Sequence, residues 1–416
     1  MSENSKSSAA KLHYSWIISV TGAAVLFSCL GLGRFSLGML LPSMGVTLDL
    51  SNSQMGLIGT CNFVGYMLAV ALAGVVTKHL GARRTITFGL LMVGLTMVAI
   101  SWARTVFAVQ TLYFLTGVGS GLANVPMMGL VSHWFLKSTR GRAAGIMLSG
   151  NGLAIVFAGF FVPFINRSLG AEGWRSGWLI MGLMSAVIAL LAFLLLRNEP
   201  GEKNLSPLGK APAPSLAKDD GLSEKAKPKT HRGTLIHLGL VYAIFGATYV
   251  VYATFIVVSM VNERGFGEGV AGSFWAAVGF LGVFSGPLFG WISDHFGRKR
   301  GIIIAYSLFT ISYALVATDL PDVFLYISVF IFGVSIWSLP TIMSAAVGDY
   351  MGPAQAAKSF AFITLFFGGG QIIGPALAGY LADLTGSFNT AFGLCAGLTA
   401  AGVGLTLFLR SPQDSK

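Results

Sequence analysis

One segment of this chain occurs twice. Residues 74–84 read GVVTKHLGARR, and residues 290–300 read GWISDHFGRKR. Each copy follows one long apolar run and precedes another. Such a recurrence indicates two related halves, and the apolar runs indicate that each half is a bundle of membrane-crossing helices. A duplicated helical bundle in a bilayer is typical of transporters.

The composition requires a lipid environment. Hydrophobic residues make up 54% of the chain and charged residues only 10%. A soluble core could not hide this much apolar surface, so we expect an integral membrane protein. The net charge of +11 comes mainly from short loops between apolar runs, which favours membrane orientation over nucleic-acid binding. Cys29, Cys61 and Cys395 all lie in apolar runs, so we expect no disulfide framework, no metal site and no cofactor.

Twelve apolar runs are long enough to cross a bilayer of about 30 Å. They lie at residues 15–43, 54–77, 83–102, 106–135, 141–165, 175–196, 235–261, 270–293, 300–318, 322–348, 357–381 and 388–409. The predicted fold is all-α, with twelve transmembrane helices in two parallel six-helix repeats, residues 15–196 and 235–409. Residues 1–14 and 410–416 are predicted tails. Residues 197–234, rich in Pro and Lys, are predicted to be a flexible cytoplasmic linker without a fold of its own.

The basic residues predict the orientation. With both termini in the cytoplasm, the inner loops receive Lys78, Arg83, Arg84, Lys137, Arg140, Arg142, Arg298, Lys299, Arg300 and Lys358. The outer loops then receive only Arg104, Arg167, Arg175 and Arg264. Because positively charged loops stay in the cytoplasm, we expect cytoplasmic termini and a location in the plasma membrane, the inner membrane of a bacterium. A monomer that contacts lipid and a small-molecule substrate, but no nucleic acid, is expected.

The repeated segment resembles the signature between spans 2 and 3 of the major facilitator superfamily, and the resemblance extends over the whole chain. The residues that carry it are Gly74, Gly81, Arg83, Arg84, Gly290, Asp294, Gly297, Arg298, Lys299 and Arg300. In that family the acid of the signature helps to hold a cytoplasmic gate against a neighbouring helix end. Asp294 matches it in the second copy, whereas Lys78 replaces it in the first. The resemblance implies alternating access, with Asp294 alone serving the gate.

Two shorter phrases resemble a branch of the superfamily. Residues 140–145 before span 5 and residues 173–175 before span 6 look like those of organic-anion and monocarboxylate porters. Span 4 lacks the arginine, and span 5 the Gly-Pro phrase, that mark proton-driven drug exporters. A similar phrase at residues 370–375 lies in span 11 instead.

Arg34 is the most unusual residue, because it lies well inside span 1. A charge at this depth costs at least about 2.5–3.5 kcal/mol, so it should face a cavity or a partner. No other span carries an Asp or Glu at comparable depth. Arg34 is therefore expected to bind an arriving anion, because a guanidinium holds a carboxylate through two hydrogen bonds. The alternative is that Arg34 bonds backbone carbonyls and braces the bundle.

Other polar and aromatic residues fall at a similar depth. The candidate substrate contacts beside Arg34 are Asn62, Tyr66, Asn124, Asn151, Tyr249, Tyr252, Trp337 and Gln371. Amide side chains can orient a ligand, and aromatic rings, including that of Trp275, can clamp its apolar body. Each of these residues could equally join two helices.

The sequence thus predicts a transporter of a small organic anion, with a monocarboxylate favoured, and not an enzyme. No nucleophile triad, phosphate loop or metal-ligand spacing occurs. The alternatives are an exporter of drugs or other amphipathic compounds and a transporter-like membrane sensor. The direction of transport and its coupling are left open.

Overall fold

The computed structural model describes residues 13–209, 232–352 and 355–409. The regular elements in these ranges are helices, joined by short turns. They are α1 (Tyr14–Leu26), η1 (Phe27–Phe35), α2 (Leu37–Leu48), α3 (Asn52–Leu80), α4 (Ala82–Ile100), α5 (Val106–Trp134), α6 (Lys137–Leu169), η2 (Gly170–Glu172), α7 (Gly173–Leu195), η3 (Pro200–Lys203), α8 (Arg232–Val258), η4 (Ser259–Glu263), α9 (Glu268–Phe296), α10 (Arg298–Val316), α11 (Asp322–Ser335), α12 (Ser338–Met351), α13 (Ala356–Thr385) and α14 (Asn389–Leu407).

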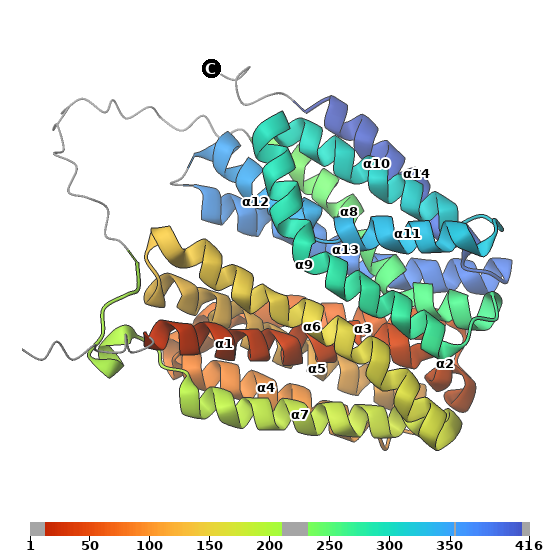
Figure 1. Ribbon diagram of the computed structural model, residues 1–416, viewed down its shortest axis with the longest axis horizontal. Helices are drawn as coiled ribbons and strands as arrows, with labels where there is room; N and C mark the ends of the chain where they lie inside the picture. Colours follow the sequence, from red (N-terminus) through yellow and green to blue (C-terminus); the bar gives the residue numbers. More distant parts are fainter. Residues whose placement is uncertain (1–12, 210–231, 353–354, 410–416) are drawn as a thin grey trace, which may run out of the picture.

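The helices form two groups, α1–α7 and α8–α14, that lie side by side (Figure 1). By length and apolarity, eleven stretches of the described residues could cross a membrane. One of them, Ser138–Leu195, has 58 residues, roughly 87 Å at about 1.5 Å per residue, which is far more than one crossing needs. It contains α6 and α7, which the short 3₁₀ turn η2 joins. Counting these as two crossings confirms the twelve predicted spans.

The first span differs from its prediction in length and in winding. It runs through α1, η1 and α2 to Leu48, whereas the sequence predicted an end at residue 43. Pro42 lies inside α2 without ending it. The middle segment, η1, is a π-helix, a wider turn that occurs often at functional sites. Arg34 lies in its last turn.

Span 10 is interrupted. α11 ends at Ser335 and α12 begins at Ser338, so residues 336 and 337 form a turn between two helical halves. Pro340 has no backbone N–H, which removes one helical hydrogen bond across this turn. The N–H of Trp337 instead donates to Ser285 Oγ on α9 at 3.0 Å.

Glycine lets helices of one group approach closely. A Cβ at Gly117 of α5 would lie 2.0 Å from the backbone oxygen of Asn62 on α3, and one at Gly65 would lie 2.1 Å from that of Phe114. Only glycine fits where backbones come this near, and small residues are the usual means of packing helices in lipid. Gly65 and Gly117 therefore allow the close packing of α3 against α5.

The start of the predicted linker packs against the N-terminal group. Residues 197–209 pack on the N-terminal group, where Leu208 N–H donates to Trp134 O and Leu136 N–H donates to Leu208 O, both at 2.9 Å. Asn198 Oδ1 accepts from the N–H of Arg83 at 2.9 Å. Paired backbone groups explain why this stretch is ordered despite its polar composition. Residues 210–231 lie outside the described residues, and residues 232–234 already belong to α8.

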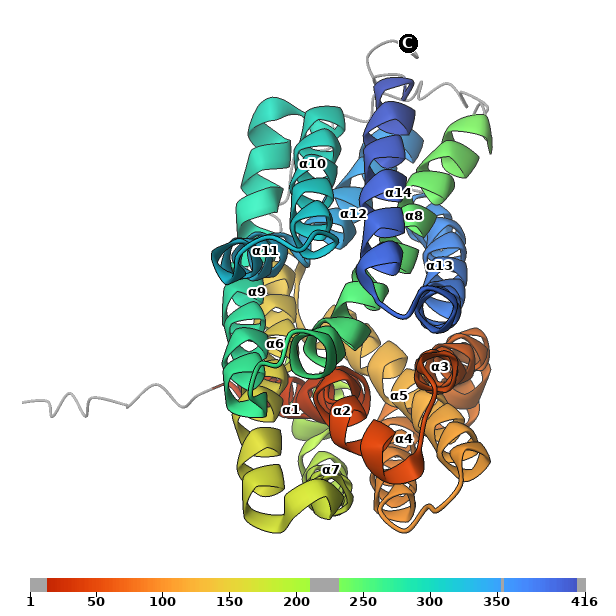
Figure 2. The same ribbon diagram turned by 90° about the vertical axis from the view of Figure 1, so that its right-hand side faces the viewer.

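The two groups touch mainly at one end. We call the end with Lys78, Arg83 and Lys299 the basic end, and the opposite end, with Glu268 and Asp383, the far end. The groups spread apart toward the basic end, at the left of Figure 1. Seen from the far end, α13 lies beside α3 and α9 beside α6 (Figure 2).

Candidate functional site

Arg34 lies where the two groups face each other, and no acidic side chain of the described residues pairs with it. Its Nε donates to Asn62 Oδ1 at 3.4 Å. Its guanidinium carbon lies 4.6 Å from the ring centroid of Phe63 and 4.2 Å from that of Tyr66. Its Nη2 is buried without a hydrogen-bond partner, and no ion pair of the described residues includes it. Two aromatic faces stabilise the cation but leave its hydrogen-bonding edge available.

Three of the predicted N-terminal contacts, Asn62, Tyr66 and Asn124, form one cluster around this guanidinium. Asn124 Nδ2 donates to the Tyr66 hydroxyl at 2.8 Å, which joins α5 to α3. Asn62 Nδ2 donates to the backbone oxygen of Tyr113 at 3.1 Å. Asn62 is therefore held in place on both sides, by α5 and by Arg34. The structure brings together four of the predicted residues, Arg34, Asn62, Tyr66 and Asn124.

A small cavity opens on this cluster from the C-terminal group. It is lined by Arg34, Phe35, Leu37, Gly38, Gly59, Asn62, Phe63, Tyr113, Val250, Ala253 and Thr254. Its volume is about 20 Å³, which is room for about one water molecule. The cavity lies between η1, α2 and α3 on one side and α8 on the other, so both groups contribute walls.

The C-terminal group adds a second polar pair. Gln371 Nε2 on α13 donates to the Tyr249 hydroxyl on α8 at 2.6 Å, and both side chains are buried. Tyr249 stacks on Phe245 and Phe367, with centroid distances of 4.8 and 5.8 Å. The pair joins α8 to α13, and α8 also lines the cavity beside Arg34 through Val250, Ala253 and Thr254.

The other predicted contacts have different surroundings. Trp337 meets Phe35, the neighbour of Arg34, edge to face at 5.8 Å and so lies at the junction of the groups. Asn151 is buried on α6, with an Oδ1 that has no partner.

Tyr252 bonds Ser328 at 2.9 Å and stacks on Phe332, inside the C-terminal group. The structure does not bring Tyr252 to the cluster. Trp275 is likewise buried on α9, with its indole N–H unpaired.

Sequence reasoning missed three features of the site. Phe63 stacks on Arg34, the Tyr113 hydroxyl donates to Arg34 O at 3.1 Å, and the π-helix η1 sets the position of the arginine. Phe63 directly follows Asn62 in the sequence, and this adjacency was the one weak indication that Phe63 lies near the site. Tyr113 and the π-helical winding depend on tertiary contacts, which no local pattern indicated.

The repeated segments cap helices within their own half. Arg298 pairs with Asp294 on α9 and, at 2.7 Å, with Asp349 on α12. Asp294 therefore contacts its own half here, and not a helix end of the other half. Lys299 Nζ donates to Leu407 O at 2.7 Å. Arg83, the equivalent of Lys299, donates to Phe193 O at 2.6 Å, so both copies cap the last helix of their half.

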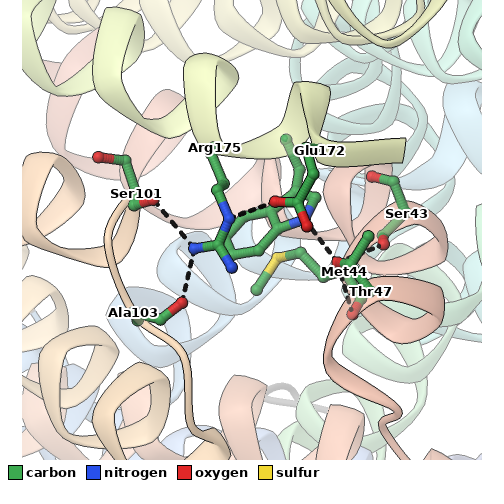
Figure 3. A network of polar contacts seen from close by, with 8 residues as sticks. Ser43, Met44, Thr47, Ser101, Ala103, Glu172 and Arg175 are labelled. Carbon is green, nitrogen blue, oxygen red and sulfur yellow. Dashed lines mark hydrogen bonds and ion pairs between the residues drawn. The ribbon is translucent and has the colours of Figure 1, made fainter. Parts of the chain in front are cut away.

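Residues 173–175 also make their contacts within one half. Arg175 pairs with Glu172 and donates to the backbone oxygens of Ser101 and Ala103, at 3.1 and 2.6 Å (Figure 3). The Trp174 indole N–H donates to Thr47 Oγ1 at 2.7 Å. These contacts tie α2, α4 and α7 together at the far end and lie apart from the Arg34 cluster.

Two apolar helical bundles that enclose a buried cation, together with the family match that follows, define a membrane transporter. The chain belongs to the major facilitator superfamily: the family described as "Uncharacterised MFS-type transporter YbfB" matches residues 26–407.

Curated relatives agree with this family. The hexuronate transporter of Bacillus subtilis (strain 168) is 26% identical over 400 residues, which cover 91% of each chain. Monocarboxylate transporter 2 of Homo sapiens is 26% identical over 370 residues, 80% of this chain and 74% of that one. Among solved structures, the nucleoside transporter NupG covers 96% of this chain and 99% of its own, with a TM-score of 0.73 and 15% identity. That likeness concerns the fold alone.

Proposed function

We propose that this transporter moves a small organic anion, a monocarboxylate, across the plasma membrane by alternating access. The observation that carries the proposal is the buried Nη2 of Arg34, which has no hydrogen-bond partner. A guanidinium without a resident acid suits an anion that arrives and leaves, since a carboxylate can accept two parallel hydrogen bonds from it.

The number of charges supports a monoanion. Within the described residues, the cluster and its cavity contain Arg34 as their one charged side chain. A second carboxylate on the substrate would be desolvated without a partner, which is costly. The opposing Tyr249–Gln371 pair is neutral and can hydrogen-bond a hydroxyl or oxo group. The names of two relatives, a hexuronate and a monocarboxylate transporter, point to the same chemistry.

The proposed substrate contacts are Arg34, Asn62, Tyr66 and Asn124 from the first half, with Tyr249 and Gln371 from the second. Asn151 and Trp337 are proposed at the margin of the site. The basic end is proposed to face the cytoplasm, following the distribution of Lys and Arg. There the repeated segments, with Asp294 in the second copy, are proposed to form the cytoplasmic gate when the halves close.

The test is uptake of radiolabelled lactate into proteoliposomes that contain only this protein, with Arg34→Gln as the variant. We expect Arg34→Gln to lose uptake and to unfold at a temperature close to that of the parent. The matched control is Arg104→Gln, which removes an exposed arginine at the far end and should transport normally. Normal uptake by Arg34→Gln would refute the proposal. Uptake of lipophilic cations but not of acids by the parent would favour an exporter of amphipathic compounds.

A further inference from the structure

A carboxylate of one half caps a helix of the other. Asp383, in the last turn of α13, accepts hydrogen bonds from the backbone N–H groups of Asn52 and Ser53 at 2.8 and 2.9 Å. These residues begin α3, whose first N–H groups have no partner within the helix. A charged acceptor at this position gains both from hydrogen bonding and from the helix dipole. Since α13 and α3 belong to different halves, the contact holds the halves together at the far end.

A second contact joins the halves at the same end. Asn166 Nδ2, in the last turn of α6, donates to Glu268 Oε2, in the first turn of α9, at 2.8 Å. The same amide lies 3.3 Å from Ser43 Oγ on α2. The helix pair α6–α9 corresponds to the pair α13–α3 in the repeat, and both pairs lie side by side in Figure 2. Each pair is thus linked through the last turn of one helix and the first turn of the other.

The other end of the α3–α13 pair carries the opposite charge. α3 ends with Lys78 in its last turn, and α13 begins with Lys358 in its first turn. An acid in the last turn of α3 could cap the N-terminus of α13, as Asp383 caps that of α3. α3 contains no Asp or Glu. Bringing these ends together therefore places two cations beside the positive end of a helix dipole, which is unfavourable.

We propose that Asp383 and the Asn166–Glu268 contact are locks that hold the halves together at the far end, and that Lys78 leaves the basic end without an equivalent lock. The empty transporter then rests with its far end closed. Both locks must break before the far end can open. When the basic end closes, no hydrogen bond between the end of α3 and the start of α13 stabilises the closed state. The inference concerns the empty protein, so it does not depend on which substrate is carried.

The test measures distances between pairs of spin labels in lipid nanodiscs without substrate. One pair, at Val46 and Leu384, reports on the far end, and the other, at Val75 and Ala357, reports on the basic end; all four residues are exposed. Cys29, Cys61 and Cys395 are first replaced by Ala. We expect Asp383→Asn to raise the population with a long far-end distance by about tenfold, because a charged acceptor of two N–H groups is lost. We expect Lys78→Asp to raise the population with a short basic-end distance.

The matched control for the first lock is Asp319→Asn. Asp319 lies at the same end and in the same half, but its bond, to Asn389 Nδ2 at 3.0 Å, stays within that half. Asn166→Leu breaks the second lock without removing a charge and should act in the same direction as Asp383→Asn. Far-end distances in Asp383→Asn and Asn166→Leu that match those of Asp319→Asn would overturn the locks. Unchanged basic-end distances in Lys78→Asp would overturn the role of Lys78.

Discussion

The Tyr113 hydroxyl donates a hydrogen bond to the backbone oxygen of Arg34 at 3.1 Å, and the Tyr113 backbone oxygen accepts one from Asn62 at 3.1 Å. One residue of α5 therefore fixes both the main chain that carries the cation and the amide beside it. Arg34 O also accepts a hydrogen bond from the backbone N–H of Ser36, the residue that follows η1. We infer that Tyr113 positions Arg34.

Tyr113→Phe should weaken uptake without abolishing it. The variant removes one hydrogen bond, worth about 1 kcal/mol, so we expect a rise in KM of about fivefold. The measurement is the KM of lactate uptake in proteoliposomes. Tyr326→Phe, which removes the hydroxyl of an exposed tyrosine on α11, is the control and should leave KM unchanged. A KM for Tyr113→Phe equal to that control would show that the bond does not position the arginine.

Arg34→Lys should fail although it keeps the charge. An ammonium group cannot offer two parallel hydrogen bonds to a carboxylate, and it stacks less well between Phe63 and Tyr66. We expect at least a tenfold loss of uptake, together with loss of the thermal stabilisation that millimolar lactate gives the parent. Retention of both by Arg34→Lys would mean that charge alone is recognised.

Gln371→Leu should weaken binding of hydroxy acids more than binding of acids without a hydroxyl group. The change removes the amide that donates to Tyr249 and puts in its place an apolar side chain that cannot hydrogen-bond to substrate. We expect the affinity for lactate to fall by about fivefold, while that for propionate, which lacks the hydroxyl, changes little. Competition of each acid with labelled lactate measures both. Equal losses of affinity for the two acids would show that Gln371 supports helix packing and does not recognise the hydroxyl group.

Gly117→Ala should destabilise the protein from within its N-terminal group. The added methyl group would lie 2.0 Å from the Asn62 backbone oxygen, so α3 and α5 must separate. Overpacking of this kind costs about 1–3 kcal/mol, which should lower the unfolding temperature in detergent and also reduce uptake, since Asn62 moves. Gly145→Ala on α6 is the control, because nothing lies within 4 Å of its added Cβ. Equal unfolding temperatures would contradict the close approach.

The sequence was sufficient to predict the class of fold. Apolar runs of the length of a bilayer and the repeat at residues 74–84 and 290–300 are local signals, and they do not depend on tertiary structure. Arg34 could be singled out for the same reason, because a charge in an apolar span is unusual wherever it points. The pairing of Tyr66 with Asn124 and of Tyr249 with Gln371 could not be foreseen, since it depends on the rotation of each helix about its axis.

Other features depended on contacts that a linear pattern cannot encode. Residues 197–209 have the composition of a linker, yet backbone pairing with Trp134 and Leu136 orders them. Tyr252, three residues from Tyr249, turns into the C-terminal group because Ser328 and Phe332 receive it there. Tyr249 instead bonds Gln371 on α13, so two tyrosines that looked equivalent have different partners.

The π-helical winding of η1 also bears on comparisons between relatives. A π-helical turn accommodates an extra residue that an ordinary α-helix of the same length would lack. In a homologue without this insertion, the side chain that occupies the same point in space as Arg34 would stand in a neighbouring column of a sequence alignment. Superposition of coordinates, and not column-by-column conservation, is then the sound way to decide which relatives share the cationic site.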